Sequence, residues 1–287
     1  MRMYCHAAAT VERLRRCYTT FVALLAGMAL LLGLSAGCED DGSDGAPTAP
    51  APQPSSEWSP LADADRPIIP NPPLGQRAYR LSIPGFGTLQ FLLHLPSGYA
   101  SQQAWPLILF LHGSGEVGTD PSVLTKLGPS GYAEGLPSFP FIVLSPQLSV
   151  EQWWDPAVLD VLLTHIVRHY RVDQDRMIVT GLSLGGYGTW SMAVTYPTRF
   201  SCAVPVAGGG DPAAVCRIAH LPVWVFHGAN DTAVPVGEAQ AMVNALRACG
   251  GNVQFTVYPE RGHDSWNPTY TNPDVFDWMA AQRRIGS

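Results

Sequence analysis

The fold is decided by the stretch Val179-Thr180-Gly181-Leu182-Ser183-Leu184-Gly185-Gly186. The residues around Ile178 are β-branched or apolar and predict a strand, whereas Tyr187 to Val194 are compatible with a helix. A serine with a glycine two positions away on each side, between a strand and a helix, predicts a sharp turn that exposes the serine hydroxyl. The order strand, turn and helix is typical of an α/β protein.

This G-x-S-x-G pattern predicts a nucleophile elbow, in which the serine has a strained backbone. Gly181 and Gly185 would relieve the crowding between the strand and the helix. The alternative is a glycine-rich turn with an incidental serine. A serine hydroxyl needs a histidine to remove its proton and a carboxylate to orient that histidine, so both groups are expected elsewhere in the chain.

Two later apolar strands are each followed by a residue of the required type. Residues 222–228 end in a turn that leads to Asp231, and residues 253–259 are followed by His263. Loops after parallel strands meet at one edge of a sheet, and the order serine, acid, histidine is that of an elbow enzyme. We therefore expect Ser183 as the nucleophile, Asp231 as the orienting acid and His263 as the general base.

Other acids and histidines offer alternatives to these assignments. Asp211, which follows the preceding strand, is the main rival to Asp231, whereas Asp264 adjoins the histidine and would rarely reach it with good geometry. His165 and His169 have a spacing that could hold a metal, but no third ligand is evident, and a solvated helix face is the favoured interpretation. No metal site is predicted.

Backbone amides are expected to stabilise the negative oxygen of a tetrahedral intermediate. Leu184, directly after the serine, would supply one N–H group. The apolar strand at residues 106–111 opens into His-Gly-Ser-Gly-Glu, where Ser114 would supply the second, with Gly115 as the alternative. The glycines could also form only a flexible turn, but no Gly-Lys-Ser or Gly-Lys-Thr follows, which excludes a phosphate loop here.

These motifs resemble those of α/β-hydrolases, and within them bacterial esterases and predicted peptidases related to feruloyl esterases and polyhydroxyalkanoate depolymerases. The similar segments extend over about residues 78–285 and are 111–116, 145–147, 181–186, 224–231 and 262–266. The resemblance implies a serine hydrolase that needs no cofactor and acts on an ester or a peptide bond. It does not identify the acyl or the alcohol group.

Four residues near the motifs are candidate substrate contacts. Trp154 and Trp266 could flank a pocket, because tryptophan offers a large flat apolar face that suits aromatic or sugar-linked esters. The alternative is that both indoles pack in the core or under loops. Glu116 and Gln147 are candidates for polar contacts.

Composition indicates one globular enzyme domain. Hydrophobic residues make up 46% of the chain and charged residues 14%, with a formal net charge of −6, so nucleic acid is not an expected partner. Alternating apolar strands and helical stretches predict a mostly parallel sheet with helices on both faces. Residues 79–83 and 89–93, separated by Pro-Gly-Phe-Gly, predict an antiparallel hairpin at its edge.

The amino terminus predicts export. Arginines precede an apolar run of about fourteen residues, which is short for a membrane span and suited to a secretion signal. The run ends in Leu-Ser-Ala-Gly before Cys38, which resembles a lipoprotein processing site. We expect a signal peptide at 1–37, a lipid on Cys38 that holds the protein at a membrane surface in the cell envelope, a Pro/Ala/acidic tether at 38–73 and a catalytic domain at 74–287. An ordinary cleaved signal, giving a secreted protein, and an uncleaved anchor are the alternatives.

Three cysteines remain after those of the amino terminus are set aside. Cys202 starts an apolar strand and is expected to be a buried free thiol. Cys216 and Cys249 lie in connecting segments and could form a disulfide in an oxidising compartment. No cysteine sits at an elbow, so a cysteine nucleophile is not expected.

The sequence thus favours a carboxylic ester hydrolase acting through an acyl-enzyme on a small-molecule or polysaccharide-linked ester. A serine peptidase with the same triad is the nearest alternative. A third alternative from a different class is a noncatalytic surface-binding lipoprotein that kept the scaffold.

Overall fold

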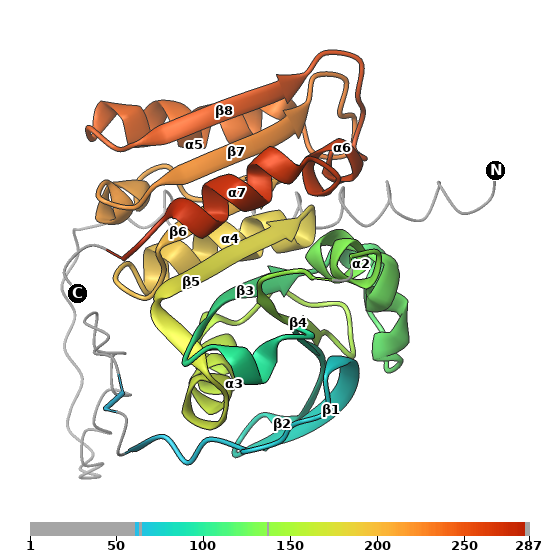
Figure 1. Cartoon of the computed structure of the whole chain (residues 1–287). Coiled ribbons are helices and arrows are strands. Elements are labelled where there is room, and N and C mark those ends of the chain that lie inside the picture. The colour runs from blue at the N-terminus through green and yellow to red at the C-terminus, as the bar shows by residue number, and fades with distance from the viewer. Residues whose placement is uncertain (1–60, 63–64, 137, 285–287) are drawn as a thin grey trace, which may run out of the picture. The chain divides into compact units, whose positions relative to one another are not determined.

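A computed structural model describes residues 61–62, 65–136 and 138–284. Strands and helices alternate along most of this part of the chain (Figure 1). The strands are β1 Gly75–Ile83, β2 Gly87–Leu95, β3 Trp105–Leu111, β4 Ile142–Gln147, β5 Val172–Leu182, β6 Cys202–Val206, β7 Val223–Gly228 and β8 Val253–Tyr258. The α-helices described are α2 Gly128–Glu134, α3 Pro156–His169, α4 Leu184–Thr195, α5 Val236–Ala248, α6 Trp266–Tyr270 and α7 Pro273–Ala281.

The described strands form one eight-stranded sheet in the order β1-β2-β4-β3-β5-β6-β7-β8. The pairs β1/β2 and β2/β4 are antiparallel, and the other neighbouring pairs are parallel. The predicted α/β fold with an antiparallel hairpin at the edge is therefore confirmed. Parallel pairing brings the carboxyl ends of β3, β5, β7 and β8 to one edge, where their loops meet.

Helices cover both faces of the sheet, and each face has its own core (Figure 1). Residues of α3, α4 and α5 pack on one face, and residues of α2, α6 and α7 pack on the other. The central strand β3 is buried along its whole length: Leu109 belongs to the first core and Phe110 to the second. This burial on both faces explains why β3 is a continuous apolar run instead of an alternating one.

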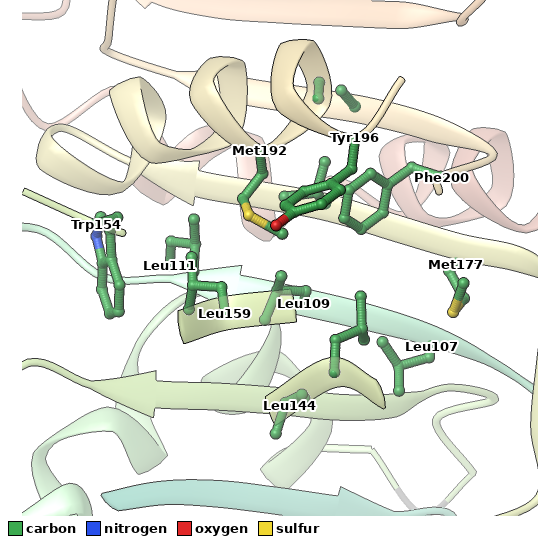
Figure 2. Packing of buried hydrophobic residues seen from close by; sticks show 14 of the residues in the cluster. Leu107, Leu109, Leu111, Leu144, Trp154, Leu159, Met177, Met192, Tyr196 and Phe200 are labelled. Atoms are coloured by element: carbon green, nitrogen blue, oxygen red, sulfur yellow. The ribbon is translucent and has the colours of Figure 1, made fainter. Parts of the chain in front are cut away.

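The first core fixes the helix that follows the elbow. Met192 of α4 and Leu159 of α3 lie among side chains of the sheet, including Leu109 and Leu144 (Figure 2). Gly188 of α4 faces the same region, where a Cβ would stand 2.7 Å from the indole of Trp154. Any larger side chain at this position would push the helix away from its neighbours.

Part of the predicted tether packs against the domain. The Arg66 guanidinium donates hydrogen bonds to the carbonyls of Val167, Tyr170 and Val172, at the carboxyl end of α3 and just beyond it. The Ile69 amide donates to the His169 carbonyl at 2.9 Å. A cation near a helix carboxyl terminus satisfies carbonyls that lack an intrahelical donor. The folded unit therefore begins before residue 74.

The predictions for the amino terminus fall on residues 1–60, outside the described part of the chain, and they stay predictions. These are the signal peptide, the lipid on Cys38 and most of the tether. Within the described residues, none of the helices has both the length and the apolar character needed to cross a bilayer.

The cysteine predictions are confirmed. Cys216 and Cys249 form a disulfide that joins the segment after β6 to the end of α5, and Cys202 is a buried free thiol. Burial raises the pKa of the Cys202 thiol, so it is held in its neutral form.

Candidate active site

Ser183 stands between β5 and α4 in a backbone conformation that few residues adopt. Its φ is 54° and its ψ is −116°, and its amide donates to the Val206 carbonyl of the neighbouring strand at 3.0 Å. The flanking glycines are needed sterically: a Cβ at Gly185 would lie 1.9 Å from the Leu111 carbonyl oxygen, and one at Gly181 would lie 2.4 Å from the Gly185 oxygen. The structure therefore has the strained turn that the glycine pattern predicts.

A continuous chain of hydrogen bonds connects Ser183, His263 and Asp231. The Ser183 Oγ lies 2.9 Å from His263 Nε2, and His263 Nδ1 lies 2.8 Å from Asp231 Oδ2. An ionised carboxylate only accepts, so the Nδ1 atom carries a proton and the Nε2 atom is available to accept the serine proton. The three residues come from the ends of β5, β7 and β8, which the sheet brings to one edge.

The Asp231 carboxylate accepts hydrogen bonds from backbone amides as well as from His263. Its side chain is fully buried, and its Oδ1 atom accepts hydrogen bonds from the amides of Ala233 and Val234, both at 2.9 Å. Burial by itself raises the pKa of Asp231, but hydrogen bonds from His227, His263 and the Val234 amide outweigh it and hold the pKa below its ordinary range. Asp231 is therefore ionised at neutral pH.

The two alternative acids, Asp211 and Asp264, have other partners than His263. Asp211 is exposed, and its carboxylate accepts a hydrogen bond from the Ala213 amide in its own turn. Asp264 points to solvent and pairs with Arg261 at 3.6 Å. The structure thus brings Asp231 to the imidazole of His263 and leaves both alternatives away from it.

Two backbone amides flank the serine. Leu184 and Ser114 are the first residues of α4 and of a 3₁₀-helix, Ser114–Glu116, so neither amide has an acceptor within its own helix. None of the described residues accepts a hydrogen bond from either amide. The loop of Ser114 lies close to Ser183, because a Cβ on Gly113 would stand 3.5 Å from the Ser183 Cβ. Both amides are thus available to a ligand.

Glu116 and Gln147 form internal contacts of this loop. The Glu116 carboxylate accepts a hydrogen bond from the Gly113 amide at 3.1 Å, and the Gln147 Nε2 donates to the carbonyls of Glu116 and Asp120. Gln147 is only 2% exposed, and its predicted contact with substrate stays a prediction. Burial raises the pKa of Glu116, although the Gly113 hydrogen bond opposes this shift. Glu116 is partly exposed, and its carboxylate holds the loop.

His112 also holds the loop that carries Ser114. Its Nδ1 lies 2.6 Å from the Gly113 carbonyl, and its Nε2 accepts a hydrogen bond from the Leu148 amide. Burial lowers the pKa of His112 to about 4, although its hydrogen bond to Gly113 opposes this shift, so the ring is neutral at pH 7. The loop that carries Ser114 is therefore fixed at both of its ends.

One of the two predicted tryptophans belongs to the core. Trp154 is 4% exposed, and its indole N–H donates to the His112 carbonyl at 3.2 Å, so it does not line an open pocket. Trp266 is half-buried and packs edge-on against His263, with ring centroids 5.1 Å apart. Trp266 thus stands beside His263, and its contact with substrate stays a prediction.

Trp153, the neighbour of Trp154 in sequence, is the exposed tryptophan of this segment. It is 52% exposed and packs edge-on against Tyr187, with ring centroids 5.6 Å apart. Tyr187 lies in the first turn of α4, since its amide donates to the Ser183 carbonyl, and its hydroxyl donates to Glu238. An aromatic surface therefore stands one helical turn from Ser183.

Among the described residues, no group of three or more His, Cys, Asp or Glu side chains is arranged to hold a metal ion. The rings of His165 and His169 lie 4.6 Å apart on α3, and the part of the chain that the structure describes brings no third His, Cys, Asp or Glu to them in an arrangement that could hold a metal.

Two comparisons by sequence agree with this geometry. Residues 157–272 match the family model described as Phospholipase/Carboxylesterase. The chain is 29% identical over 140 residues to Poly(3-hydroxyalkanoate) depolymerase C of Paucimonas lemoignei, covering 43% of this chain and 32% of the relative. It is 26% identical over 167 residues to "Probable feruloyl esterase C" of Aspergillus terreus, and the match covers 54% of this chain and 59% of the relative.

Comparison with solved structures also finds similarity to esterases. A structure described as a thermostable esterase has a TM-score of 0.64 and 31% identity, covering 73% of this chain and 63% of that one. A structure described as a ferulic acid esterase has a TM-score of 0.56 and 16% identity, and the match covers 72% of this chain and 97% of that one. The fold, the elbow and the order of the site residues place the chain in the α/β-hydrolase superfamily. Within it the chain is related to the esterases named above, as predicted, although it spans less than two thirds of the first relatives' lengths.

Glu116 gives the first test of the loop. We expect Glu116→Ala to lower kcat about tenfold, because the Gly113 amide loses its acceptor and the Ser114 amide loses its position. Glu116→Gln keeps a carbonyl oxygen for Gly113 and should retain most of the activity. Steady-state hydrolysis of a 4-nitrophenyl ester measures both variants. Equal losses in the two variants would show that the carboxylate acts through its charge and not as a loop anchor.

Proposed function

We propose that the protein is a serine carboxylic ester hydrolase that works through an acyl-enzyme. The observation that carries this proposal is the hydrogen-bonded chain from Ser183 Oγ through the His263 imidazole to the Asp231 carboxylate. A buried, ionised acid, an imidazole with its proton fixed on Nδ1 and a strained serine are the three parts that nucleophilic acyl transfer needs.

The first half of the reaction makes the acyl-enzyme. His263 Nε2 takes the proton of Ser183 as the oxygen attacks the ester carbonyl, and the carbonyl electron pair moves onto oxygen. The amides of Leu184 and Ser114 donate hydrogen bonds to that oxyanion. When the carbonyl re-forms, the alcohol leaves and receives the proton from His263.

The second half releases the acid. Water gives a proton to His263 Nε2 and attacks the acyl carbon, and the same two amides stabilise the second oxyanion. The carbonyl then re-forms, Ser183 leaves and recovers its proton from His263. Throughout both halves Asp231 keeps its charge, which stabilises the imidazolium and holds its orientation.

The aromatic surface supports a substrate with a flat group. Trp153 is exposed and Trp266 stands beside His263, so an aromatic or sugar ring of an ester could lie against either indole. Glu238, bonded to the Tyr187 hydroxyl, places a carboxylate in the same surface, where it would accept hydrogen bonds from substrate hydroxyls. These features favour small aromatic or polysaccharide-linked esters.

A panel of substrates tests the function and the surface together. We expect turnover of acetyl, butyryl and feruloyl esters and little turnover of peptide 4-nitroanilides. Trp153→Ala should raise KM for the feruloyl ester about fivefold and leave that for the acetyl ester nearly unchanged, since only the larger group would reach the indole. Val150→Ala, on the same loop and 58% exposed, is the matched control.

Three results would contradict the proposal. Turnover of amides without esters would indicate a serine peptidase. Absence of both activities in a folded protein that also fails to react with a fluorophosphonate would indicate a noncatalytic surface-binding protein. Equal effects of the Trp153 and Val150 variants would exclude Trp153 as a substrate contact.

A further inference from the structure

A second histidine lies against the acid of the triad. His227, next to the last residue of β7, is fully buried, and its Nε2 atom stands 2.8 Å from the Val234 carbonyl oxygen and 3.3 Å from Asp231 Oδ2. Its ring therefore bridges the two ends of the loop that carries Asp231. Within the described residues no hydrogen bond joins the His227 side chain to Ser183, and the mechanism above does not use His227.

The position of one proton follows from these partners. A carbonyl oxygen only accepts hydrogen bonds, so the Nε2 atom of His227 must carry the proton that points at Val234. The same Nε2 atom lies 3.3 Å from Asp231 Oδ2. The other ring nitrogen, Nδ1, is buried and has no hydrogen-bond partner among the described residues. The polar contacts of His227 are thus all directed at the Asp231 loop.

The two oxygens of Asp231 are held differently. The Oδ1 atom accepts from two backbone amides of its own turn, at Ala233 and Val234. The Oδ2 atom is shared by His263, at 2.8 Å, and His227, at 3.3 Å. Without His227, the only side chain on Oδ2 would be the imidazole that Asp231 has to orient.

We propose that His227 is a positioning residue that fixes Asp231 Oδ2 and so sets the orientation and basicity of His263. This rests on the proposed function, because it assigns His263 as the general base. A hydrogen-bond donor near Oδ2 stabilises the negative charge of the carboxylate. The carboxylate then stabilises the protonated form of His263 less strongly. The hydrogen bond from His227 also contributes to the lowered pKa of Asp231, against the opposing effect of burial.

Few other charged groups act on this pair. On the loop of His263, Arg261 and Asp264 pair with each other in solvent, and Glu260 is exposed. On the side of α4 the facing group is the Ser183 hydroxyl. Beyond His227 and His263, the hydrogen bonds on the Asp231 carboxylate come from backbone amides, which do not titrate. A change at His227 should therefore be visible in the titration of His263.

Two amide substitutions separate positioning from simple packing. In His227→Gln the amide nitrogen can reach the place of Nε2 and donate to Asp231 and Val234. In His227→Asn it stops near the place of Nδ1 and cannot. We expect His227→Asn to lower kcat about tenfold with KM within about twofold, and His227→Gln to retain most of the activity. Thermal unfolding of both variants checks that each is folded.

The pH dependence of kcat/KM gives a second measurement, which should not change if His227 only fills space in the core. With one donor fewer on Asp231, His263 holds its proton more tightly, so the acid limb of kcat/KM in His227→Asn should move to higher pH by about half a unit. The limb in His227→Gln should stay near that of the wild type. The proton resonance of His263 Nδ1–H, read by NMR without any substrate, should shift in the Asn variant and be kept in the Gln variant.

Equal losses in the two variants, or an unmoved acid limb and unmoved resonance in folded His227→Asn, would overturn the proposal. If His227→Asn does not fold, a wild-type pH profile and resonance in His227→Gln support it, and an altered profile in that variant overturns it. Lack of ester turnover in the wild type would overturn the proposed function instead, and the NMR resonance would then decide the role of His227 by itself.

Discussion

Ser183→Ala is expected to lower kcat for ester hydrolysis by about 10⁶-fold, the loss that removal of the nucleophile causes in well-studied serine hydrolases. The physical reason is that the Oγ atom, 2.9 Å from His263 Nε2, is the atom that forms the acyl bond. Alanine also has a Cβ and should tolerate the strained φ of 54° about as well as serine does, so the fold should be unaffected. Steady-state kinetics on an aryl ester measure the loss.

Ser122→Ala is the matched control for this variant. Ser122 is exposed in the 3₁₀-helix Pro121–Lys126, where its side chain and its backbone amide both bond to the exposed Asp120 carboxylate, and the substitution keeps the backbone bond. Its kcat should equal that of the wild type. Turnover by folded Ser183→Ala at a tenth or more of the wild-type rate would eliminate Ser183 as the nucleophile.

Asp231→Asn is expected to lower kcat by about 10⁴-fold, as the same change does in serine proteases. An asparagine amide can present an N–H group to His263, which favours the tautomer with its proton on Nε2. That tautomer cannot accept the Ser183 proton. The variant should therefore bind substrate with KM close to that of the wild type and fail in the chemical step.

The rival acid supplies the control. Asp211→Asn changes an exposed carboxylate that is bonded only within its own turn, so we expect wild-type kinetics from it. The reverse outcome, a large loss in Asp211→Asn with an active Asp231→Asn, would mean that the acid comes from the loop after β6.

The main features of the site could be predicted because each one follows a strand. Ser183, Asp231 and His263 come directly after apolar runs, and the parallel order of these strands carries all three to one edge of the sheet. Local patterns therefore indicated which residues meet, although the sequence alone could not give the distances between them.

Less predictable are the side chains that bond to backbone groups, and those that point inward or outward depending on a shift of one residue along the chain. Trp153 and Trp154 are neighbours in sequence, yet one is 52% exposed and the other 4%, because Trp154 turns to the His112 carbonyl. Gln147 binds carbonyls of Glu116 and Asp120, which no sequence pattern marks.

The contact of His227 with Asp231 was also missed. A histidine at the end of an apolar strand has many possible backbone partners, so its place in the sequence does not mark a contact with a carboxylate. The available signal was the spacing of four residues to Asp231, across a turn that contains a glycine. The packing of Arg66 on α3 was missed for a similar reason, because its acceptors are main-chain carbonyls.

The most direct test of the central claim is to label the wild-type protein with a fluorophosphonate and to locate the adduct by mass spectrometry of its peptides. A hydroxyl activated by His263 and Asp231 should give one phosphonate per chain, attached to Ser183, and the reaction should fall off as His263 becomes protonated. An adduct on a different residue, or a folded protein that takes up no label at neutral pH, would contradict the account.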